Sequence, residues 1–581
     1  MQGHAPPQGA GNAGVHYSPV PSATLAGPFG AYVADRWGRL ARVLKLDGSQ
    51  LLLLLILSVS AALRFHALGQ QPLWLDEGYS WWDAQQSWAD IWRLVPQCDP
   101  HPPLYFVLLK GWTGLFGDGA LAMRALSASM GVATTAVIYL AGRQISRPIG
   151  LVAALFFALT PFQIEFAHEA RPYALLCLGG SLIVYGALRA LRDRRAGIGW
   201  AALTIGSLIV LWANNTSVLI VASMVGGFGL LMALDQRMRK RWHALLVALA
   251  VIGVCWLPYL PLLIEQARGV SSDFWIPKPI GWRFTNELRF VVSLSSYEAV
   301  YWAVAALFGG LVLLWRRGYW RQAILLAALG GAPVLLNYGV SMVSRSIFIG
   351  RALIGVAPAM AIMLACAVML IGSVRWRALA LVALLAAHGL AIVVMVENDK
   401  GKEPWDKIAS QLAGSMSEDG ALQNANAAVV LTVPNELVLP LAHAMEELHM
   451  RMPVRGAPAN FPSPGLAARY PSGKCAPSVA GWDLGRLASL INGRRIVYFI
   501  TRQNNAYDPG NRIAGFLRSQ GLASEGMRRF MPGFLEVHKF VAPVLRRGAA
   551  ASAPTGAVAS APTHGSVAAA RHGHDERMPW P

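Results

Sequence analysis

Two carboxylates stand side by side just after the first long apolar run of the chain. They are Asp76 and Glu77, in the segment 72–79, PLWLDEGY. Charged groups are costly beside lipid, so such a pair indicates chemistry at a membrane surface. Tryptophan and tyrosine flank the pair, and a half-buried setting can raise the pKa of a carboxylate into the range that suits a general base. The alternative is a pair of solvated charges or an N-cap for a following helix.

Two later segments carry residue types suited to substrate contact. His101 lies between two prolines, which fix the backbone on either side and would present the imidazole rigidly to an anion or a hydroxyl. The segment 169–173, EARPY, places Glu169, Arg171 and Tyr173 together at a helix junction. A local ion pair that ends the helix is the simpler alternative there.

Several arginines are expected on the same side of the membrane as Asp76. Arginine suits bidentate contact with phosphate, although some of these residues would serve as anchors for lipid headgroups. Arg351 stands at the end of an apolar run and is placed to bind a phosphate that arrives from the bilayer. The candidates for substrate or phosphate binding are His101, Arg124, Arg171, Tyr173, Arg345 and Arg351.

The elements that must position these residues are membrane spans. Hydrophobic residues make up 55% of the 581 residues and charged residues only 14%, against about 25% in soluble proteins. The apolar residues come in blocks long enough to cross a hydrocarbon core as helices. The net charge of +19 comes largely from Lys and Arg in the short loops between these blocks, which is the pattern of cytoplasmic loops and not of nucleic-acid binding. The five cysteines show no CxxC spacing, so neither a zinc site nor a redox motif is expected.

The arginines before the first apolar run place the N-terminus in the cytoplasm and Asp76 outside. The apolar stretch 103–116 is short and is expected to lie at the interface or to be re-entrant. This choice puts every dense basic cluster inside. It predicts a polytopic α-helical protein with about 11 spans, within a range of 11–13, at 51–63, 120–141, 149–167, 174–188, 198–213, 216–234, 243–263, 299–315, 322–342, 352–372 and 378–396.

Four regions follow from these patterns. Residues 1–48 form a cytoplasmic, mostly disordered tail, and residues 49–397 form a transmembrane catalytic domain with its first outer loop at 69–119. Residues 398–545 alternate predicted helices and strands, which indicates a small extracytoplasmic α/β domain, and 546–581 form a disordered tail. The expected helices of the α/β domain are 405–416, 437–450 and 513–520, and its expected strands are 427–433, 495–500 and 534–540.

Four motifs in order carry a resemblance to a known family. They are LWLDE at 73–77, HPPLY at 101–105, MRALS at 123–127 and EARPYAL at 169–175. Together they resemble the bacterial glycosyltransferase family 39 and protein O-mannosyltransferase-like membrane enzymes of the GT-C superfamily, and more distantly the lipid A aminoarabinose transferase. The resemblance implies a GT-C-like fold in the bacterial inner membrane. It also implies transfer of a hexosyl or pentosyl group, with inversion, from a polyprenyl-phosphate sugar to a hydroxyl of a lipid, glycan or protein at the periplasmic face.

The resemblance also implies roles for single residues. Asp76 matches the catalytic base, with Glu77 beside it, and His101 matches a position near the carrier phosphate. The lipid A enzyme has an acidic residue before proline where this chain has Arg171, so Glu169 becomes the candidate for a second catalytic carboxylate. No metal ligand is assigned. A divalent cation held by oxygens of Asp76, Glu77 and Asp99 remains an alternative.

Other functions remain open at this stage. A ligase or polymerase that uses diphosphate-linked glycans is the nearest alternative, and a transporter or flippase of the lipid carrier is the next. Transporters place charged residues at mid-membrane, whereas the candidates here gather at one surface. Cys98 and Cys475 are the two cysteines expected outside, and in an oxidising compartment they could pair and tie the α/β domain over the site.

Overall fold

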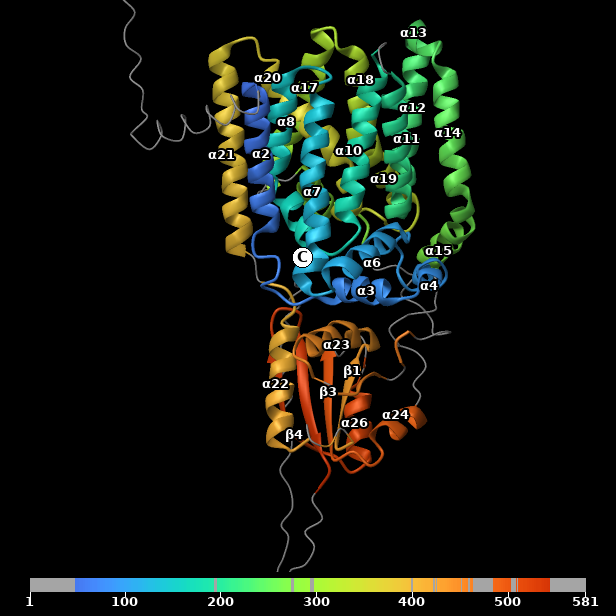
Figure 1. Ribbon diagram of the computed structural model, residues 1–581, viewed down its shortest axis with the longest axis vertical. Helices are drawn as coiled ribbons and strands as arrows, with labels where there is room; N and C mark the ends of the chain where they lie inside the picture. Colours follow the sequence, from blue (N-terminus) through green and yellow to red (C-terminus); the bar gives the residue numbers. More distant parts are fainter. Residues whose placement is uncertain are drawn as a thin grey trace, which may run out of the picture.

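The computed structural model consists of a helical bundle and a small α/β domain below one end of it (Figure 1). It describes residues 47–543 except 193–195, 273–275, 293–296, 399–400, 422–423, 425, 451, 458–459, 463–483, 503–507 and 509. The predicted tail 546–581 and most of the predicted tail 1–48 lie outside the described residues.

The bundle is built of apolar helices. Within the described part of the chain, nine helices are long and apolar enough to cross a membrane, and a bent pair would make a tenth. The predicted polytopic helical fold is confirmed, whereas the count of 11 stays a prediction. The nine are α2 Gly48–Phe65, α7 Ala120–Gly142, α10 Tyr173–Ala190, α11 Ala196–Ala213, η2 Asn215–Ser217 with α12 Val218–Leu234, α14 Trp242–Trp256 continuing through η3 Leu257–Tyr259 into α15 Leu260–Ser272, α18 Trp320–Gly330 with α19 Ala332–Val343, η4 Gly350–Val356 with α20 Ala357–Met369, and α21 Val374–Asn398.

The predicted span over 149–167 is bent in the structure. Helix α8 Arg147–Leu159 is capped by Thr160, and the chain turns by 67° into α9 Pro161–Glu165 and η1 Phe166–His168. Pro161 lacks the N–H that would continue the helical bonding. The Thr160 hydroxyl donates to the Phe156 carbonyl at 2.7 Å. The bend brings the chain to Glu169.

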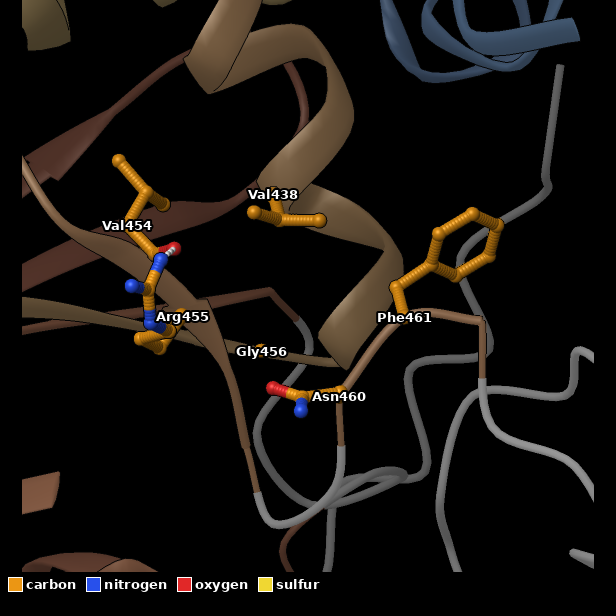
Figure 2. Close-up of a pocket in the computed structure, with 6 residues that line it drawn as sticks. All are labelled: Val438, Val454, Arg455, Gly456, Asn460 and Phe461. Carbon is orange, nitrogen blue, oxygen red and sulfur yellow. Dashed lines mark hydrogen bonds between the residues drawn. The ribbon is translucent and has the colours of Figure 1, made fainter. Parts of the chain in front are cut away.

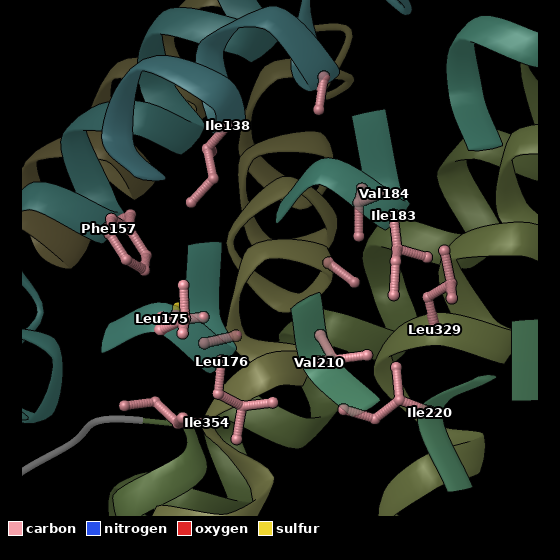
Figure 3. Packing of buried hydrophobic residues seen from close by; sticks show 14 of the residues in the cluster. Ile138, Phe157, Leu175, Leu176, Ile183, Val184, Val210, Ile220, Leu329 and Ile354 are labelled. Atoms are coloured by element: carbon pink, nitrogen blue, oxygen red, sulfur yellow. The ribbon is translucent and has the colours of Figure 1, made fainter. Parts of the chain in front are cut away.

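Helices close-pack in the centre of the bundle. Figure 3 shows buried residues of α7, α10, α11, α12 and α18 meeting there, among them Ile138, Leu176, Val210, Ile220 and Leu329. Helices α10 and α11 approach at backbone distance, because a Cβ on Gly206 would lie 2.7 Å from the Gly179 carbonyl oxygen. This packing fixes α10, which begins at Tyr173.

A layer of short helices lies between the bundle and the α/β domain (Figure 1). The predicted interfacial stretch 103–116 forms α6, too short to count among the spans, with Tyr105, Phe106 and Leu109 buried. The layer contains α3 Leu75–Gln85, α4 Trp88–Arg93, α5 Val95–Cys98 and α6 Leu104–Phe116. Three further helices of the bundle region are α13 Gln236–Arg239, α16 Trp282–Val292 and α17 Tyr297–Arg316.

The α/β domain is a five-stranded sheet in the order β2-β1-β3-β5-β4. Strand β1 pairs in parallel with β2 and β3, while β5 is antiparallel to both β3 and β4. Strand β1 is buried throughout because hydrophobic clusters cover both of its faces. The elements are α22 Trp405–Glu418, β1 Ala428–Val433, η5 Asn435–Leu437, α23 Val438–Glu447, β2 Val454–Gly456, α24 Leu484–Ile491, β3 Ile496–Arg502, α26 Arg512–Ser519, β4 Ala523–Phe530 and β5 Leu535–Val541.

Candidate active site

Charged residues and one tyrosine from six parts of the chain meet at the end of the bundle that faces the α/β domain. They come from α3, the α5–α6 loop, the first turns of α7, the turn that leads into α10, η4, and the segment between α21 and α22. Direct contacts connect most of them, and we call the set the charged cluster. Its members are Asp76, Glu77, Asp83, Asp99, His101, Arg124, Glu169, Arg171, Tyr173, Arg351 and Lys402.

Asp76 is the partly exposed carboxylate of this cluster. Its Oδ2 lies 3.4 Å from Nη1 of Arg351, and the two side chains are 27% and 26% exposed. The Arg351 guanidinium also lies over the ring of Tyr173, 5.9 Å from the ring centroid, within range of a cation–π contact. A reachable carboxylate thus stands beside a reachable cation held on an aromatic ring.

Glu77, the next residue, is completely buried. Its Oε1 accepts from Nε of Arg124 at 2.8 Å and from the Ala170 amide at 3.0 Å. Its Oε2 accepts from Nη2 of Arg124 at 2.6 Å and lies 3.3 Å from Nζ of Lys402. Burial alone would raise the pKa of Glu77, but the charges of Lys402 and Arg124 outweigh burial and lower that pKa to about 2. Glu77 is therefore a permanent carboxylate whose oxygens are occupied.

Arg124 is fully engaged within the protein. Besides its two bonds to Glu77, it donates to the carbonyl oxygens of Leu68, Gln71 and Pro72, at 2.7, 2.7 and 2.8 Å. A guanidinium has five N–H groups, and these bonds use all five. Arg124 thus fixes the 68–72 segment and the start of α3.

Arg171 joins three parts of the cluster. It donates to Oδ2 of Asp99 at 2.9 Å and to the backbone oxygen of Asp76 at 3.1 Å, and its Nη2 lies 3.0 Å from Nδ1 of His101. That same Nδ1 lies 2.6 Å from Oδ1 of Asp99. A ring nitrogen either donates or accepts, so the tautomer of His101 selects the carboxylate or the guanidinium as its partner. Despite burial, the charges of Arg171 and His101 hold the pKa of Asp99 well below its usual range.

Two other carboxyl groups are poised differently. Burial raises the pKa of Glu169 to about 7, and the nearby charge of Lys402 only partly opposes this. Its Oε2 is buried with no hydrogen-bond partner among the described residues. Asp83 on α3 is fully buried, and neither of its carboxyl oxygens has a hydrogen-bond partner among the residues that the structure describes. Burial and the neighbouring charge of Asp99 raise its pKa well above the usual value. Burial thus favours the protonated form of Asp83, whereas Glu169 changes charge near neutral pH.

The structure brings together eight of the nine predicted site residues, which are Asp76, Glu77, His101, Arg124, Glu169, Arg171, Tyr173 and Arg351. Arg345 instead lies exposed in the segment between α19 and η4. Sequence reasoning missed Asp83 and Lys402. Asp83 stands seven residues after Asp76 and thus on the same helix face, which was an available signal. Lys402 lies just before α22, the first helix of the α/β domain, and gave no such signal.

The possible metal ligands and the cysteines are considered by their contacts in the structure. Among the described residues, no group of three or more His, Cys, Asp or Glu side chains could hold a metal ion. Asp76, Glu77 and Asp99 each pair with a different arginine. Cys98 is disulfide-bonded, and the free cysteines of the described part are Cys177, Cys255 and Cys366. Cys475, the predicted partner of Cys98, lies outside the described residues.

A pocket of about 350 Å³ lies in the α/β domain and not in the charged cluster (Figure 2). Its rim includes Phe461, whose ring contacts Tyr79 and Trp82 of α3 edge-on, with centroids 5.5 and 5.2 Å apart. The pocket is lined by Val438, Val454, Arg455, Gly456, Asn460 and Phe461.

Comparisons with known proteins agree with this architecture. Residues 100–259 match the model of the family described as dolichyl-phosphate-mannose-protein mannosyltransferase. The structure is similar to that of ArnT from Cupriavidus metallidurans bound to undecaprenyl phosphate, with a TM-score of 0.55 and 14% identity, over 86% of this chain and 99% of that one. The apo state of ArnT gives the same TM-score and identity over 84% and 97%.

An uncharacterized protein of Aquifex aeolicus (strain VF5) is 23% identical over 222 residues, which span 37% of this chain and 44% of that relative. The aligned region thus covers less than half of the relative's length. The resemblance to membrane glycosyltransferases with the GT-C fold is confirmed by the fold together with the family match. The chain is a multi-pass helical membrane protein whose fold is similar to that of these enzymes.

Proposed function

We propose that this protein is a glycosyltransferase that moves a sugar from a polyprenyl-phosphate donor to an acceptor hydroxyl, with inversion and with Asp76 as the base. The reaction takes place at the periplasmic face of a bacterial inner membrane. The observation that carries the proposal is the exposure of Asp76, whose side chain is 27% accessible. The side chains of Glu77, Asp99 and Glu169 are only 0%, 2% and 10% accessible. An incoming hydroxyl can reach Asp76 far more readily than the others.

The chemistry requires one base and one cation. An oxygen of Asp76 takes the proton of the acceptor hydroxyl, and the hydroxyl oxygen forms a bond to the anomeric carbon. The bond between that carbon and the phosphate oxygen breaks, and its electron pair leaves with the carrier phosphate. A single displacement of this kind inverts the anomeric carbon. The phosphate is a weak base and needs no acid to leave, so the protein has only to stabilise its developing negative charge.

Arg351 is the cation best placed for this charge. It is partly exposed, and its guanidinium is the group best matched to phosphate oxygens. Arg124 and Arg171, the other two candidates within the cluster, are 2% and 5% accessible and already bonded inside the protein. We assign Arg124 and Arg171 to positioning, with Arg171 holding His101 and the backbone of Asp76.

The architecture supports a reaction on the side of the membrane away from the cytoplasm. The basic residues of the predicted cytoplasmic loops include Arg237 and Arg239 on α13, which lies at the end of the bundle opposite the α/β domain (Figure 1). Under the positive-inside rule, the end carrying Asp76 faces away from the cytoplasm. The name of the matching family and the undecaprenyl phosphate bound in the ArnT structure support a lipid-phosphate donor.

The test is glycan and lipid mass spectrometry of a deletion strain complemented with wild type or with Asp76→Asn. We expect the deletion strain to lack one sugar, the wild type to restore it, and Asp76→Asn to fail although the protein is inserted. Full restoration by Asp76→Asn would refute Asp76 as the base. Transfer that persists in the deletion strain when donor is supplied from outside, together with loss of carrier translocation, would instead favour a flippase.

A further inference from the structure

Lys402 lies in the segment that joins the last span, α21, to α22 of the α/β domain. Its Nζ is 3.3 Å from Oε2 of Glu77 and 4.0 Å from Oε1 of Glu169, and it donates to the His168 carbonyl at 3.2 Å. Its backbone amide donates to the Gln71 side chain at 3.1 Å. One cation from outside the bundle thus bridges the two buried carboxyl groups beside Asp76.

The next residue, Glu403, ties the same segment to α3. Its Oε2 accepts from the Leu75 amide at 3.2 Å and from the Trp405 indole at 2.9 Å, and its Oε1 lies 2.8 Å from Nη1 of Arg502 on β3. The first amides of a helix have no partner within the helix, and a carboxylate there also interacts favourably with the helix dipole. The α/β domain therefore supplies the partner for the first amide of α3, the helix that carries Asp76 and Glu77.

The remaining contacts of α3 with this domain are close. Tyr79 donates from its hydroxyl to Glu436 at 2.6 Å. A Cβ on Gly78 would lie 3.0 Å from both the nitrogen and Cδ of Pro440, so α3 and α23 pack without room for a side chain. Leu75 and Tyr79 also belong to the hydrophobic cluster that covers one face of the sheet. Helix α3 is thus shared between the bundle and the domain.

From these contacts we infer that Lys402 is a positioning residue of the transfer reaction. It couples the docking of the α/β domain to the charged cluster, because it holds Glu77 and Glu169 beside Asp76. This inference rests on the proposed function. Two buried carboxylates would repel each other, and the ammonium between them offsets that repulsion at contact distance, where the low dielectric makes it strong. Without Lys402, Glu169 would hold its proton more tightly and could no longer carry charge next to Asp76.

Several other charged groups, besides Lys402, influence the protonation of Glu169. The acidic groups that face Glu169 are Glu77, Glu165 and Asp76. The other cations that interact with it are Arg124 and Arg351. Glu77 already neutralises Arg124, and Asp76 pairs with Arg351. Lys402 is therefore the cation whose removal changes the charge at Glu169 most.

The test compares Lys402→Met, which removes the charge, with Lys402→Arg, which keeps it, and with Lys407→Met on the exposed face of α22 as the control. The first readout is the infrared titration of the carboxyl band that Glu169→Gln abolishes. We expect its midpoint to move to higher pH by about one pH unit or more in Lys402→Met, and to stay in place in the other two variants. The second readout is turnover against pH, which should show the same displacement of its acidic limb.

The outcomes separate the two proposals. An unmoved band in Lys402→Met, with wild-type turnover and pH profile, overturns the inference. A lower yield of folded protein with an unmoved band also overturns it, because this result shows a merely structural lysine. A wild-type protein that transfers no sugar but shows the displaced band in Lys402→Met refutes the proposed function, while Lys402 is still shown to control Glu169. In the Glu169→Gln background, Lys402→Met should leave the pH profile unchanged.

Discussion

Asp76 and Glu77 are neighbours in sequence, yet replacing Glu77 by an amide should mainly lower stability, whereas replacing Asp76 should mainly lower turnover. The ordinary pKa of Glu77 is 4.5, and in the folded protein it is about 2. A depression of this size corresponds to roughly 3 kcal/mol of folding free energy. Because the folded pKa is lowered, this stabilisation is present above pH 4.5 and is lost as the pH falls toward 2. Glu77→Gln should therefore lose it at neutral pH.

The buried ion pair between Glu77 and Arg124 points to the same loss of stability. Removing one partner of a buried ion pair leaves an uncompensated charge, which costs about 3–5 kcal/mol. In Glu77→Gln that charge is Arg124, whose side chain is only 2% accessible, so water cannot solvate its charge in place of Glu77. Asp76→Asn instead alters a partly exposed contact at 3.4 Å, where an ion pair contributes at most about 1 kcal/mol.

The assay is thermal unfolding in detergent at pH 7, with turnover measured on the same preparations. Asp76→Asn should unfold at nearly the wild-type temperature and lose turnover by about 10²–10⁴-fold, the contribution of a general base. Glu77→Gln should unfold at a clearly lower temperature and give less folded protein. Asp406→Asn, on the exposed side of α22, is the matched control. Wild-type stability in Glu77→Gln, or a strongly destabilised Asp76→Asn, would refute the division of roles.

Three further predictions concern the rest of the site. Arg351→Gln should raise the KM for the lipid-phosphate donor at least about tenfold, since a charge-assisted phosphate contact is lost, and KM values for donor and acceptor measured separately test this. The pKa of Glu169 is raised from its ordinary value of 4.5 to about 7, so the folded protein keeps a proton that the unfolded chain releases, and the free energy of unfolding falls by about 3 kcal/mol as the pH rises from 4.5 to 7. Glu169→Gln should remove this part of the pH dependence of the unfolding temperature. Equal curves of unfolding temperature against pH for wild type and Glu169→Gln would contradict the prediction. Gly78→Ala should cost about 1–3 kcal/mol and loosen the α/β domain, because the new methyl would meet Pro440 at 3.0 Å, whereas Gly111→Ala on α6 meets nothing within 4 Å and should be silent in limited proteolysis.

Most of the apolar helices, the short helix over 103–116 and much of the α/β domain could be predicted because each follows from a local pattern. Apolar length alone indicates helices such as α10, and an apolar run indicates the buried strand β1. Strand β4 was not predicted, because its residues are exposed almost throughout and show no alternation of apolar and polar types. The bend at Pro161 had a local signal, since a proline within an apolar run interrupts helical bonding, but the continuous hydrophobicity concealed it.

That most of the candidate residues lie together could be predicted better than the contacts that each of them makes. The motifs placed Asp76 and Glu77 at the surface, but consecutive residues of a helix point about 100° apart. Only the tertiary structure shows that Glu77 turns inward to Arg124 while Asp76 turns toward Arg351. Lys402 could not be found from sequence, because its importance comes from contacts with Glu77 and with residues before α10, far away in the chain.

An acidic pair at this position solves a problem that a single carboxylate would not. A catalytic base must be accessible and yet held in one place, and an exposed side chain on a short helix is not held by its own contacts. Here Glu77 anchors the first turn of α3 through Arg124 and the Ala170 amide, so the backbone that carries Asp76 is fixed from inside. Glu403 fixes the same turn from the side of the α/β domain. Asp76, the proposed base, is therefore partly exposed while Glu77 and Glu403 hold its backbone in place, and we expect that loosening either anchor lowers turnover even when Asp76 itself is unchanged.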